Sequence, residues 1–285
     1  YITNHGYGHG VRTAAICNAF MPQVRITIRT TLPRQFFEEE IHRDFSYAPA
    51  RFDCGCLQSD SLTTDPEKTA ACYGELAWEN GLRLAAEAQW LRDHKTDVVS
   101  DIVPFAFAAA SAAGIPSVAV TNFTWYDVYA QSLSHIPGFS PVLEEMRRQY
   151  ELADLLLALE PALPMDYFRE RLDTPPVGRY GRNRRAELVA RYNMVPSKKI
   201  GLIYFGHFGL RGMDWTALER FLPWEFIGLC PLSPAPKNYR VIEKTDFPYQ
   251  DLVASVDLMI AKMGYCVVSE SMLAGTPLPY VPRDD

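Results

Sequence analysis

Apolar runs of strand length alternate with helix-like stretches along most of the chain, and this alternation predicts an α/β fold. Residues 97–101 form a β-branched run that ends in an acid, Asp101. A helical stretch over 105–113 follows, Gly114 ends it, and residues 117–120 form the next strand. Because strand, helix and strand in this order make a βαβ unit, the two strands are expected to pair in parallel.

The same alternation restarts in the second half of the chain. Between the halves, residues 160–185 are rich in proline and arginine and show little periodicity, so we place the domain boundary there. The prediction is two doubly wound, Rossmann-like domains, 1–182 and 183–285, the second incomplete because the chain stops directly after a strand. The other expected strands are 1–3, 24–28, 155–159, 199–205, 225–229, 241–242, 258–261 and 278–281, and the other expected helices are 11–20, 70–93, 141–153, 249–255 and 267–274.

The composition is that of an ordinary globular protein, with 48% hydrophobic and 22% charged residues. A net charge of −6 argues against a nucleic-acid partner, because such proteins need a concentrated positive surface. No apolar run approaches the roughly 20 residues that a membrane span requires. The cysteines are scattered and no signal peptide is visible, so we expect thiols in a reducing compartment, the cytoplasm.

The segment His5-Gly6-Tyr7-Gly8-His9-Gly10 joins the end of the first strand to the start of a helix. Glycines there let the backbone approach a ligand, and a helix N-terminus presents N–H groups to oxygen-rich ligands. Histidine, with an ordinary pKa of about 6.5, accepts protons at neutral pH. A tight turn with two exposed imidazoles is the alternative, but two histidines among three glycines favour function. The spacing differs from the GxGxxG dinucleotide fingerprint.

Asp101 closes a parallel strand at the carboxyl edge of the sheet, the edge where this loop also lies. A carboxylate at that place can orient a histidine and stabilise its imidazolium. The competing interpretation is that Asp101 caps the following helix, a position that aspartate favours. We favour the functional interpretation.

In the second half, residues 262–265 (KMGY) follow a strand and precede a helix that carries Glu270. Gly264 leaves room for a diphosphate, Lys262 supplies a counter-charge, and Glu270 can reach ribose hydroxyls. A capped helix with a solvated glutamate is the alternative. A second glycine loop at 206–209 favours the ligand-binding interpretation.

Residues 121–126 (TNFTWY) end a strand with polar and aromatic groups, a composition that suits sugar hydroxyls and ring faces. Core packing of Phe123 and Trp125 is the other interpretation, and the sequence does not separate the two. The chain contains no Asp-x-Asp motif, so nothing marks a metal-held diphosphate, and no metal is expected.

A family resemblance rests on four blocks of the sequence: ITNHGYGHGVRT, DCGCLQSDSLTTD, VVSDIVPFAFAAASAAGIPSVAVTNFTW and LMIAKMGYCVVSESMLAGTPLPYVPRDD. They resemble the glycosyltransferase-like domain found at the N-terminus of plant L-arabinokinases and as stand-alone bacterial proteins. More distantly, the chain is similar to GT-B enzymes such as the peptidoglycan N-acetylglucosaminyltransferase and the UDP-glycosyltransferases. The resemblance implies the GT-B fold, two Rossmann-like domains facing a cleft. Nothing resembles small-molecule kinase motifs, so no kinase activity is predicted.

The resemblance also implies roles for individual residues. In that group the histidine that closes the first glycine-rich loop is the catalytic base, which corresponds to His9, and an aspartate at a later strand end orients it, which suggests Asp101. The Gly-x-x-x-x-Ser-Glu stretch holds the nucleotide, and Glu270 matches the ribose-binding acid. The expected donor-binding residues are Gly206, His207, Lys262, Gly264, Tyr265, Ser269 and Glu270, and the expected acceptor-binding residues are His5, Gly8, Asn122 and Trp125.

The resulting prediction is an inverting, metal-independent, hexosyltransferase-like glycosyltransferase. It moves a sugar from a nucleoside diphosphate donor, expected to be UDP-linked, to the hydroxyl of an unidentified small molecule or glycan. The nucleotide sugar is a co-substrate, so no separate cofactor is expected. Two alternatives stay open. A UDP-sugar epimerase shares the fold but relies on further carboxylates, which the sequence does not place, and a non-catalytic nucleotide-sugar-binding protein would keep the fold without the chemistry.

Overall fold

The chain divides into two compact units, Tyr1–Val177 and Gly178–Asp285. The computed structural model describes residues 1–58, 64–205 and 213–280. The division falls slightly before the predicted boundary at 182/183, because the end of the proline- and arginine-rich stretch is bound to the second unit. The backbone N–H of Arg182, for example, donates to Asp251 Oδ1 at 2.8 Å.

Parallel strands form the sheet of the first unit. The order is β3 (Val98–Ser100), β4 (Ser117–Thr121), β5 (Leu155–Leu159) and β6 (Arg171–Thr174), and β1 (Thr27–Ile28) pairs with β2 (Ser46–Tyr47). The first residues of the chain lie between the β1–β2 pair and the four-stranded sheet and bond to both. The N–H of Ile2 donates to the carbonyl of Arg29 at 3.0 Å, and the N–H of Asp101 donates to the carbonyl of Tyr1 at 2.9 Å. The chain after Ile2 therefore emerges beside the end of β3.

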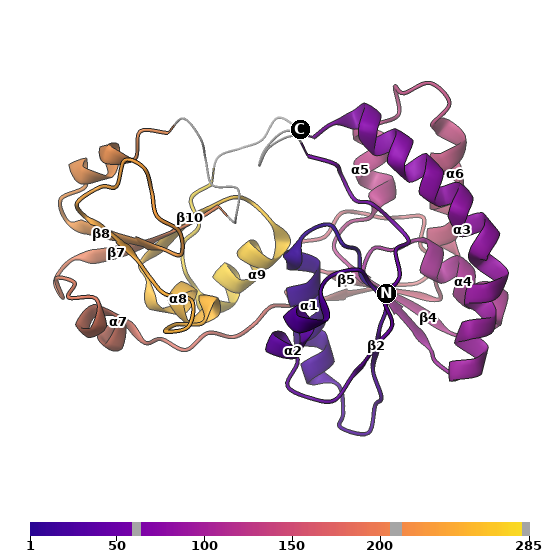
Figure 1. The fold of residues 1–285 in the computed structure, drawn as a ribbon, viewed down its shortest axis with the longest axis horizontal. Helices are drawn as coiled ribbons and strands as arrows, with labels where there is room; N and C mark the ends of the chain where they lie inside the picture. The colour runs from indigo at the N-terminus through magenta and orange to yellow at the C-terminus, as the bar shows by residue number, and fades with distance from the viewer. Residues whose placement is uncertain (59–63, 206–212, 281–285) are drawn as a thin grey trace. The chain divides into compact units, whose positions relative to one another are not determined.

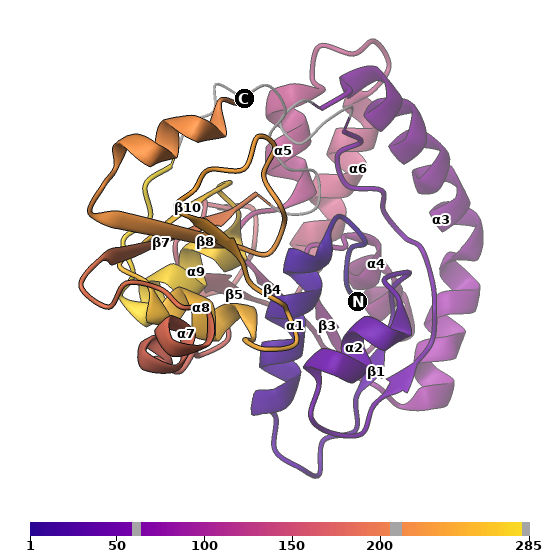
Figure 2. The same cartoon turned by 60° about the vertical axis from the view of Figure 1, so that its left-hand side comes forward.

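Helices cover both faces of this sheet. They are α1 (Tyr7–Ala19), α2 (Arg34–Glu40), α3 (Pro66–His94), α4 (Phe105–Ala113), α5 (Trp125–Ser132) and α6 (Ser140–Glu151). α1 packs against α2, whereas α4 packs against both α3 and α6. These two groups lie on opposite sides of the sheet (Figures 1 and 2). The predicted doubly wound α/β architecture of this unit is confirmed.

Capping explains where several of these helices begin and end. The Asp65 side chain accepts from the N–H of Lys68 at 3.1 Å, so α3 begins earlier than residue 70. Gly114 ends α4 with a φ of 71°, as predicted, because glycine adopts this left-handed conformation without a steric penalty. Thr124 and Asp127 form a capping box that starts α5, a helix that the sequence analysis missed.

The second unit contains a second parallel sheet. Its order is β10 (Leu258–Ala261), β7 (Lys199–Tyr204), β8 (Trp224–Gly228) and β9 (Tyr239–Val241), and its helices are α7 (Arg185–Arg191), α8 (Tyr249–Ser255), α9 (Tyr265–Ala274) and the 3₁₀ helix η1 (Trp215–Arg220). Buried side chains from strands and helices form its core, among them Leu202, Ile227, Phe247, Leu252 and Met259. The predicted restart of the strand and helix alternation is confirmed.

Several expectations about single elements were wrong. The first helix begins at Tyr7 and not near residue 11, so residues 7–10 of the glycine-rich segment are helical. Residues 278–280 do not form the expected last strand, and Val281 lies outside the described residues. Short elements went unpredicted because they contain too few positions for a periodicity to show; they are β2, β6, α2, α7 and η1.

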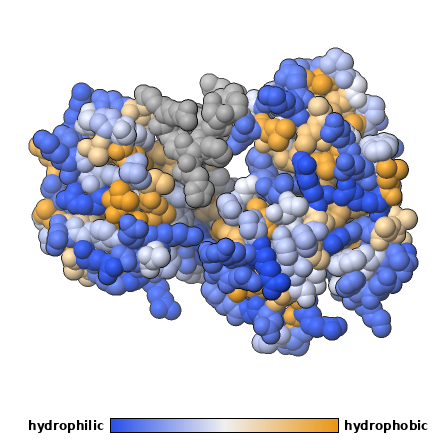
Figure 3. Space-filling model, in the orientation of Figure 1, coloured by the Kyte–Doolittle hydropathy of each residue, from blue (hydrophilic) through white to orange (hydrophobic). Residues whose placement is uncertain are grey.

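In the part of the chain that the structure describes, no helix is long and apolar enough to cross a membrane. On the face drawn in Figure 3, hydrophilic residues cover most of the surface and apolar residues form small separate patches. Most large apolar side chains instead lie in the buried clusters of the two units.

Candidate active site

The expected first strand is only an isolated parallel bridge between Ile2 and Asp101, and the glycine-rich segment turns from it into α1. Gly6 precedes the helix with a φ of 79°, a conformation that glycine adopts readily. Because α1 begins at Tyr7, His9 lies in its first turn. Gly10 lets the helix approach α2, since a Cβ there would come within 2.5 Å of the Phe36 ring. The glycines therefore serve a turn and a close helix contact, and together these place His9 at the carboxyl edge of the sheet.

His9 and Asp101 are in direct contact. His9 Nδ1 lies 2.9 Å from Asp101 Oδ2, and the two side chains are only 11% and 5% exposed. Asp101 follows β3 and forms a parallel bridge with Ile2, which brings it next to the turn that leads into α1. The structure thus brings together the two residues expected to be catalytic, although 92 positions separate them.

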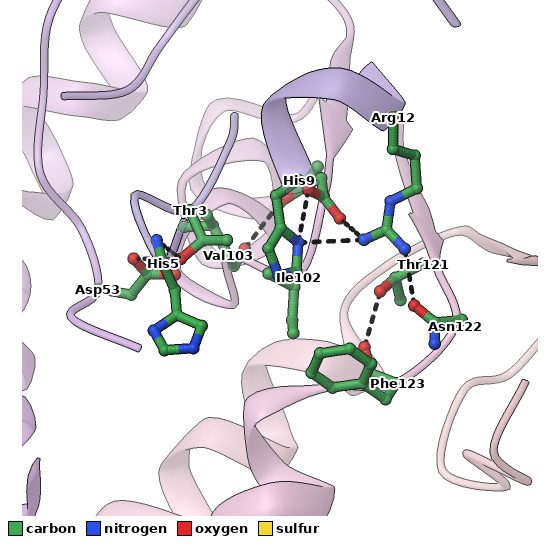
Figure 4. A network of polar contacts seen from close by, with 12 residues as sticks. Thr3, His5, His9, Arg12, Asp53, Ile102, Val103, Thr121, Asn122 and Phe123 are labelled. Atoms are coloured by element: carbon green, nitrogen blue, oxygen red, sulfur yellow. Dashed lines mark hydrogen bonds and ion pairs between the residues drawn. The ribbon is translucent and has the colours of Figure 1, made fainter. Parts of the chain in front are cut away.

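Arg12 joins this contact, and the sequence analysis did not identify it. Its Nη2 donates to Asp101 Oδ1 and lies 3.1 Å from His9 Nδ1, while its Nη1 donates to Asn122 Oδ1 at 2.6 Å (Figure 4). Burial alone would raise the pKa of Asp101, but the charge of Arg12 and the hydrogen bonds from Arg12 and His9 outweigh burial and hold this pKa below its usual value. Asp101 is therefore a carboxylate at neutral pH.

A strained turn follows Asp101. Ile102 has a φ of 70° and is 1% exposed, and such a φ is an outlier for a β-branched residue. The Tyr150 hydroxyl donates to the carbonyl of Ile102, and the Ser100 hydroxyl donates to the carbonyl of Val103 at 2.9 Å. These buried bonds hold a backbone conformation that costs about 1–3 kcal/mol. The direction of the Asp101 side chain is therefore fixed by the core.

A second buried carboxylate, Asp53, stabilises the surroundings of His5. Asp53 accepts hydrogen bonds from the Thr3 hydroxyl and from Trp125 Nε1, both at 2.9 Å. Burial raises the pKa of Asp53, and these hydrogen bonds offset part of that increase. The His5 ring lies edge-on to Trp125 with centroids 5.2 Å apart, and a Cβ on Gly55, whose φ is 58°, would come within 2.4 Å of it. His5 is therefore held between Trp125 and Gly55.

The predicted acceptor residues differ in their surroundings. Gly8 is exposed and His5 is half-buried, so both are within reach of solvent. Asn122 is half-buried, but its side-chain oxygen accepts from Arg12. The structure therefore places Asn122 in the polar network around His9.

Trp125 requires a correction. Trp125 was placed among the acceptor-binding residues, with core packing left open, but it is 1% exposed and its indole N–H donates to Asp53. The core-packing interpretation holds for this residue. Phe123, by contrast, is half-buried, with its ring centroid 6.0 Å from that of His9.

In the second unit, β10 leads through Lys262 and Gly264 into α9. Gly264 directly precedes the helix, and, its chain neighbours aside, no heavy atom of the described residues lies within 4 Å of the position that a Cβ would occupy. α9 begins at Tyr265, and the N-terminus of a helix carries a partial positive charge that favours an anion. The backbone N–H of Lys262 donates to the carbonyl of Tyr204 at 3.4 Å, which places Lys262 at the same edge of the sheet.

Ser269 and Glu270 are not exposed to a ligand. Ser269 is 0% exposed, and its hydroxyl donates to the carbonyl of Cys266 at 3.3 Å. Glu270 is 2% exposed and accepts from the Arg179 backbone N–H, Nε and Nη2 at 3.2, 2.7 and 3.2 Å. A Cβ on Gly178 would come within 2.9 Å of Glu270 Cγ. Glu270, which was expected to bind a ribose, therefore anchors the start of the second unit. A ribose could reach this carboxylate only by displacing Arg179.

Gly206 and His207, which complete the predicted donor-binding set, lie outside the described residues. Within the described ranges, no group of three or more His, Cys, Asp or Glu side chains is placed to hold a metal ion. Arg12 and Arg179 were not among the predicted site residues. A basic residue three positions after His9 on one helix face was the available signal for Arg12, whereas no local pattern pointed to Arg179.

The chain is similar in sequence to an L-arabinokinase of Arabidopsis thaliana, to which it is 31% identical over 294 residues. The alignment covers 100% of this chain and 28% of the plant protein, so the chain spans less than a third of that relative's length. No protein-family model matches the chain.

Several solved structures share the fold. A UDP-glucosyltransferase from Polygonum tinctorium capable of glucosylating indoxyl superimposes with a TM-score of 0.69 at 13% identity, over 98% of this chain and 79% of that one. UGT2 of Phytolacca americana, solved with UDP-2-fluoroglucose and pterostilbene, gives 0.63 at 12% identity, over 98% and 78%. The calicheamicin glycosyltransferase gives 0.60 at 18% identity, over 99% and 77%. The chain has the GT-B fold of these glycosyltransferases, as the sequence resemblance implied.

Proposed function

We propose that the chain transfers a sugar from a nucleoside diphosphate donor to an acceptor hydroxyl, with inversion at the anomeric carbon. The observation that carries the proposal is the contact of 2.9 Å between His9 Nδ1 and Asp101 Oδ2 at the carboxyl edge of a GT-B sheet. The names of two structures with this fold refer to UDP-glucosyl transfer and to bound UDP-2-fluoroglucose, which supports a UDP-linked donor. The acceptor is an unidentified small molecule or glycan.

His9 is the general base of this proposal. An ionised carboxylate only accepts hydrogen bonds, so Asp101 requires the hydrogen on Nδ1 and leaves the lone pair on Nε2. Nε2 takes the proton of the acceptor hydroxyl while the acceptor oxygen bonds to the anomeric carbon. The bond from that carbon to the diphosphate oxygen breaks on the opposite side, and the diphosphate keeps the bonding electrons. The proton remains on His9 until solvent removes it.

The donor half of the proposal rests on the N-terminus of α9. Its first-turn N–H groups and the ammonium of Lys262 supply positive charge for the leaving diphosphate, and Gly264 leaves room for it. No metal and no separate cofactor is needed for this step. The kinase activity in the name of the plant relative is not proposed for this chain.

A UDP-sugar epimerase is the second candidate, because such enzymes need further carboxylates and the structure places one near His9. Asp53 is close enough to interact electrostatically with His9 and Asp101. Its oxygens, however, already accept from Thr3 and Trp125, so transfer is preferred. Incubation with a UDP-sugar alone separates the two, since an epimerase interconverts sugars without any acceptor.

The test of the proposal is release of UDP from a panel of UDP-sugars, with and without a panel of hydroxyl acceptors. His9→Gln is compared with His42→Gln, which changes an exposed histidine of the same unit. Loss of the general base is expected to lower acceptor-dependent release by about 10²–10⁴-fold, whereas the control retains the wild-type rate. Equal rates for His9→Gln and wild type would remove His9 from the mechanism.

A further inference from the structure

The proposed function gives no role to Arg12, although this residue lies at the centre of the His9 network (Figure 4). Arg12 follows His9 by three positions on α1, so both side chains lie on one face of the helix. The Arg12 side chain is 1% exposed, and a guanidinium stays charged in proteins. A buried charge needs a partner, and Asp101 supplies it.

The positive charge of Arg12 and the negative charge of Asp101 balance each other only while His9 is neutral. In a buried pair of histidine and aspartate alone, the carboxylate favours the imidazolium as its counter-ion. Here the carboxylate of Asp101 already has a counter-ion in Arg12, so an imidazolium would add an uncompensated charge. That charge would also face Arg12 Nη2, which lies 3.1 Å from His9 Nδ1.

Other groups around His9 do not change this balance. Asp53 also interacts electrostatically with His9, but burial raises its pKa and so disfavours its negative form. The rings of Phe123 and Trp125 lie 6.0 and 6.3 Å from the His9 ring and have no charge. The contacts with Asp101 and Arg12 therefore dominate.

We infer that Arg12 is a positioning residue that keeps the buried pair ready as a base, with His9 neutral and protonated on Nδ1 and Asp101 ionised. Asn122 contributes, because its side-chain oxygen accepts from Arg12 Nη1 at 2.6 Å and fixes the plane of the guanidinium. Asn122 thus holds Arg12 in place. The inference builds on the proposed function, in which His9 is the base, but its test needs no substrate.

The experiment follows the imidazole nitrogens by long-range ¹H–¹⁵N NMR during a pH titration of ¹⁵N-histidine-labelled protein. The His9 signals are assigned with His9→Gln. Arg12→Gln removes the charge, Arg12→Lys keeps it, and Arg25→Gln removes an exposed arginine of the same unit as a control. We expect wild-type His9 to be neutral at neutral pH, with hydrogen on Nδ1. In Arg12→Gln the titration midpoint should rise by about one to three pH units.

Arg12→Lys and Arg25→Gln should titrate close to wild type, because the charge beside His9 is kept in both. A folded Arg12→Gln protein with the wild-type midpoint would overturn the inference. If Arg12→Gln fails to fold, the other spectra decide. A wild-type His9 that is charged at neutral pH, or that has hydrogen on Nε2, contradicts the inference, and so does a midpoint in Arg12→Lys that moves by more than about one pH unit.

The two proposals fail separately. A midpoint that rises in Arg12→Gln supports the role of Arg12 even if no UDP-sugar is turned over, in which case only the proposed function fails. A rate that drops in His9→Gln while the Arg12→Gln midpoint stays unchanged removes the role of Arg12 and leaves the transfer mechanism intact.

Discussion

Asp101→Asn keeps the shape of the side chain and removes its negative charge, so it shows what that charge does. In the native protein the carboxylate accepts from Arg12 and holds His9 Nδ1 at 2.9 Å. The carboxamide can meet Nδ1 with its NH₂ group instead, which moves the ring hydrogen to Nε2. Because Nε2 then has no lone pair for the acceptor's proton, UDP release should fall by about 10²–10⁴-fold.

The same substitution leaves Arg12 without its ion-pair partner. The side chains of Arg12 and Asp101 are 1% and 5% exposed, so the pair is buried. Removal of one member of a buried pair costs about 3–5 kcal/mol, because the other charge stays uncompensated. We expect the free energy of unfolding at neutral pH to fall by that amount.

The pH dependence has a definite sign. The pKa of Asp101 is lowered in the folded protein, so the unfolded chain binds more protons as the solution becomes acidic. The stabilisation by this carboxylate is present above the ordinary aspartate pKa of about 3.9 and is lost as pH falls through the lower folded value. Wild type should therefore lose this contribution below about pH 4, whereas Asp101→Asn has none to lose.

Guanidinium chloride unfolding followed by circular dichroism, at neutral pH and near pH 3, measures both effects. Asp53→Asn is the matched control, because it removes another buried carboxylate of the same unit and leaves Asp101 in place. Asp53→Asn retains Asp101, so it should still lose the stabilisation by Asp101 when the pH is lowered. The reasoning is refuted if Asp101→Asn is as stable as wild type at neutral pH, or loses as much stability as wild type on acidification.

Three further predictions use the same assays. Gly55→Ala should lower the free energy of unfolding, measured in urea, by about 1–2 kcal/mol, because the φ of Gly55 is positive and the added Cβ would meet His5. The control Gly74→Ala places its Cβ in open space on α3 and should leave this free energy unchanged or raise it. Glu270→Gln should lower the free energy of unfolding by about 1–3 kcal/mol, because it removes a buried acceptor from Arg179, whereas Glu187→Gln, whose side chain is 56% exposed, should lower it by less than about 1 kcal/mol. Equal losses of stability in the two variants would contradict the anchor role of Glu270. Chelation by EDTA should leave UDP release unchanged, and a loss restored by Mg²⁺ or Mn²⁺ would contradict the metal-free step.

The contact of His9 with Asp101 was predictable because Asp101 follows β3, and Ile2, which bridges Asp101 in parallel, leads into the turn before His9 at the same edge of the sheet. Arg12 was missed for a related reason. With the helix expected to begin near residue 11, His9 lay in a loop and had no helical neighbour three positions later. The capping signal that starts the helix at Tyr7 comes from the backbone of Gly6, with no side-chain cap to read.

Burial was the property that the sequence did not reveal. Trp125 and Ser269 were expected at a ligand, but each lies in a core that residues distant in sequence complete. The pairing of Glu270 with Arg179 joins residues 91 positions apart, across a stretch without periodicity. The local sequence around a helical glutamate does not show whether its carboxylate binds a ribose or a guanidinium. Only the packed structure distinguishes these two roles.

The anomeric configuration of the first-formed product tests the central claim most directly. A UDP-sugar with an α linkage is turned over in an NMR tube, with an acceptor or with water in its place, and the configuration is determined from the anomeric proton before mutarotation. A single displacement with His9 as base predicts the β-configured product. An α-configured first product would contradict the account.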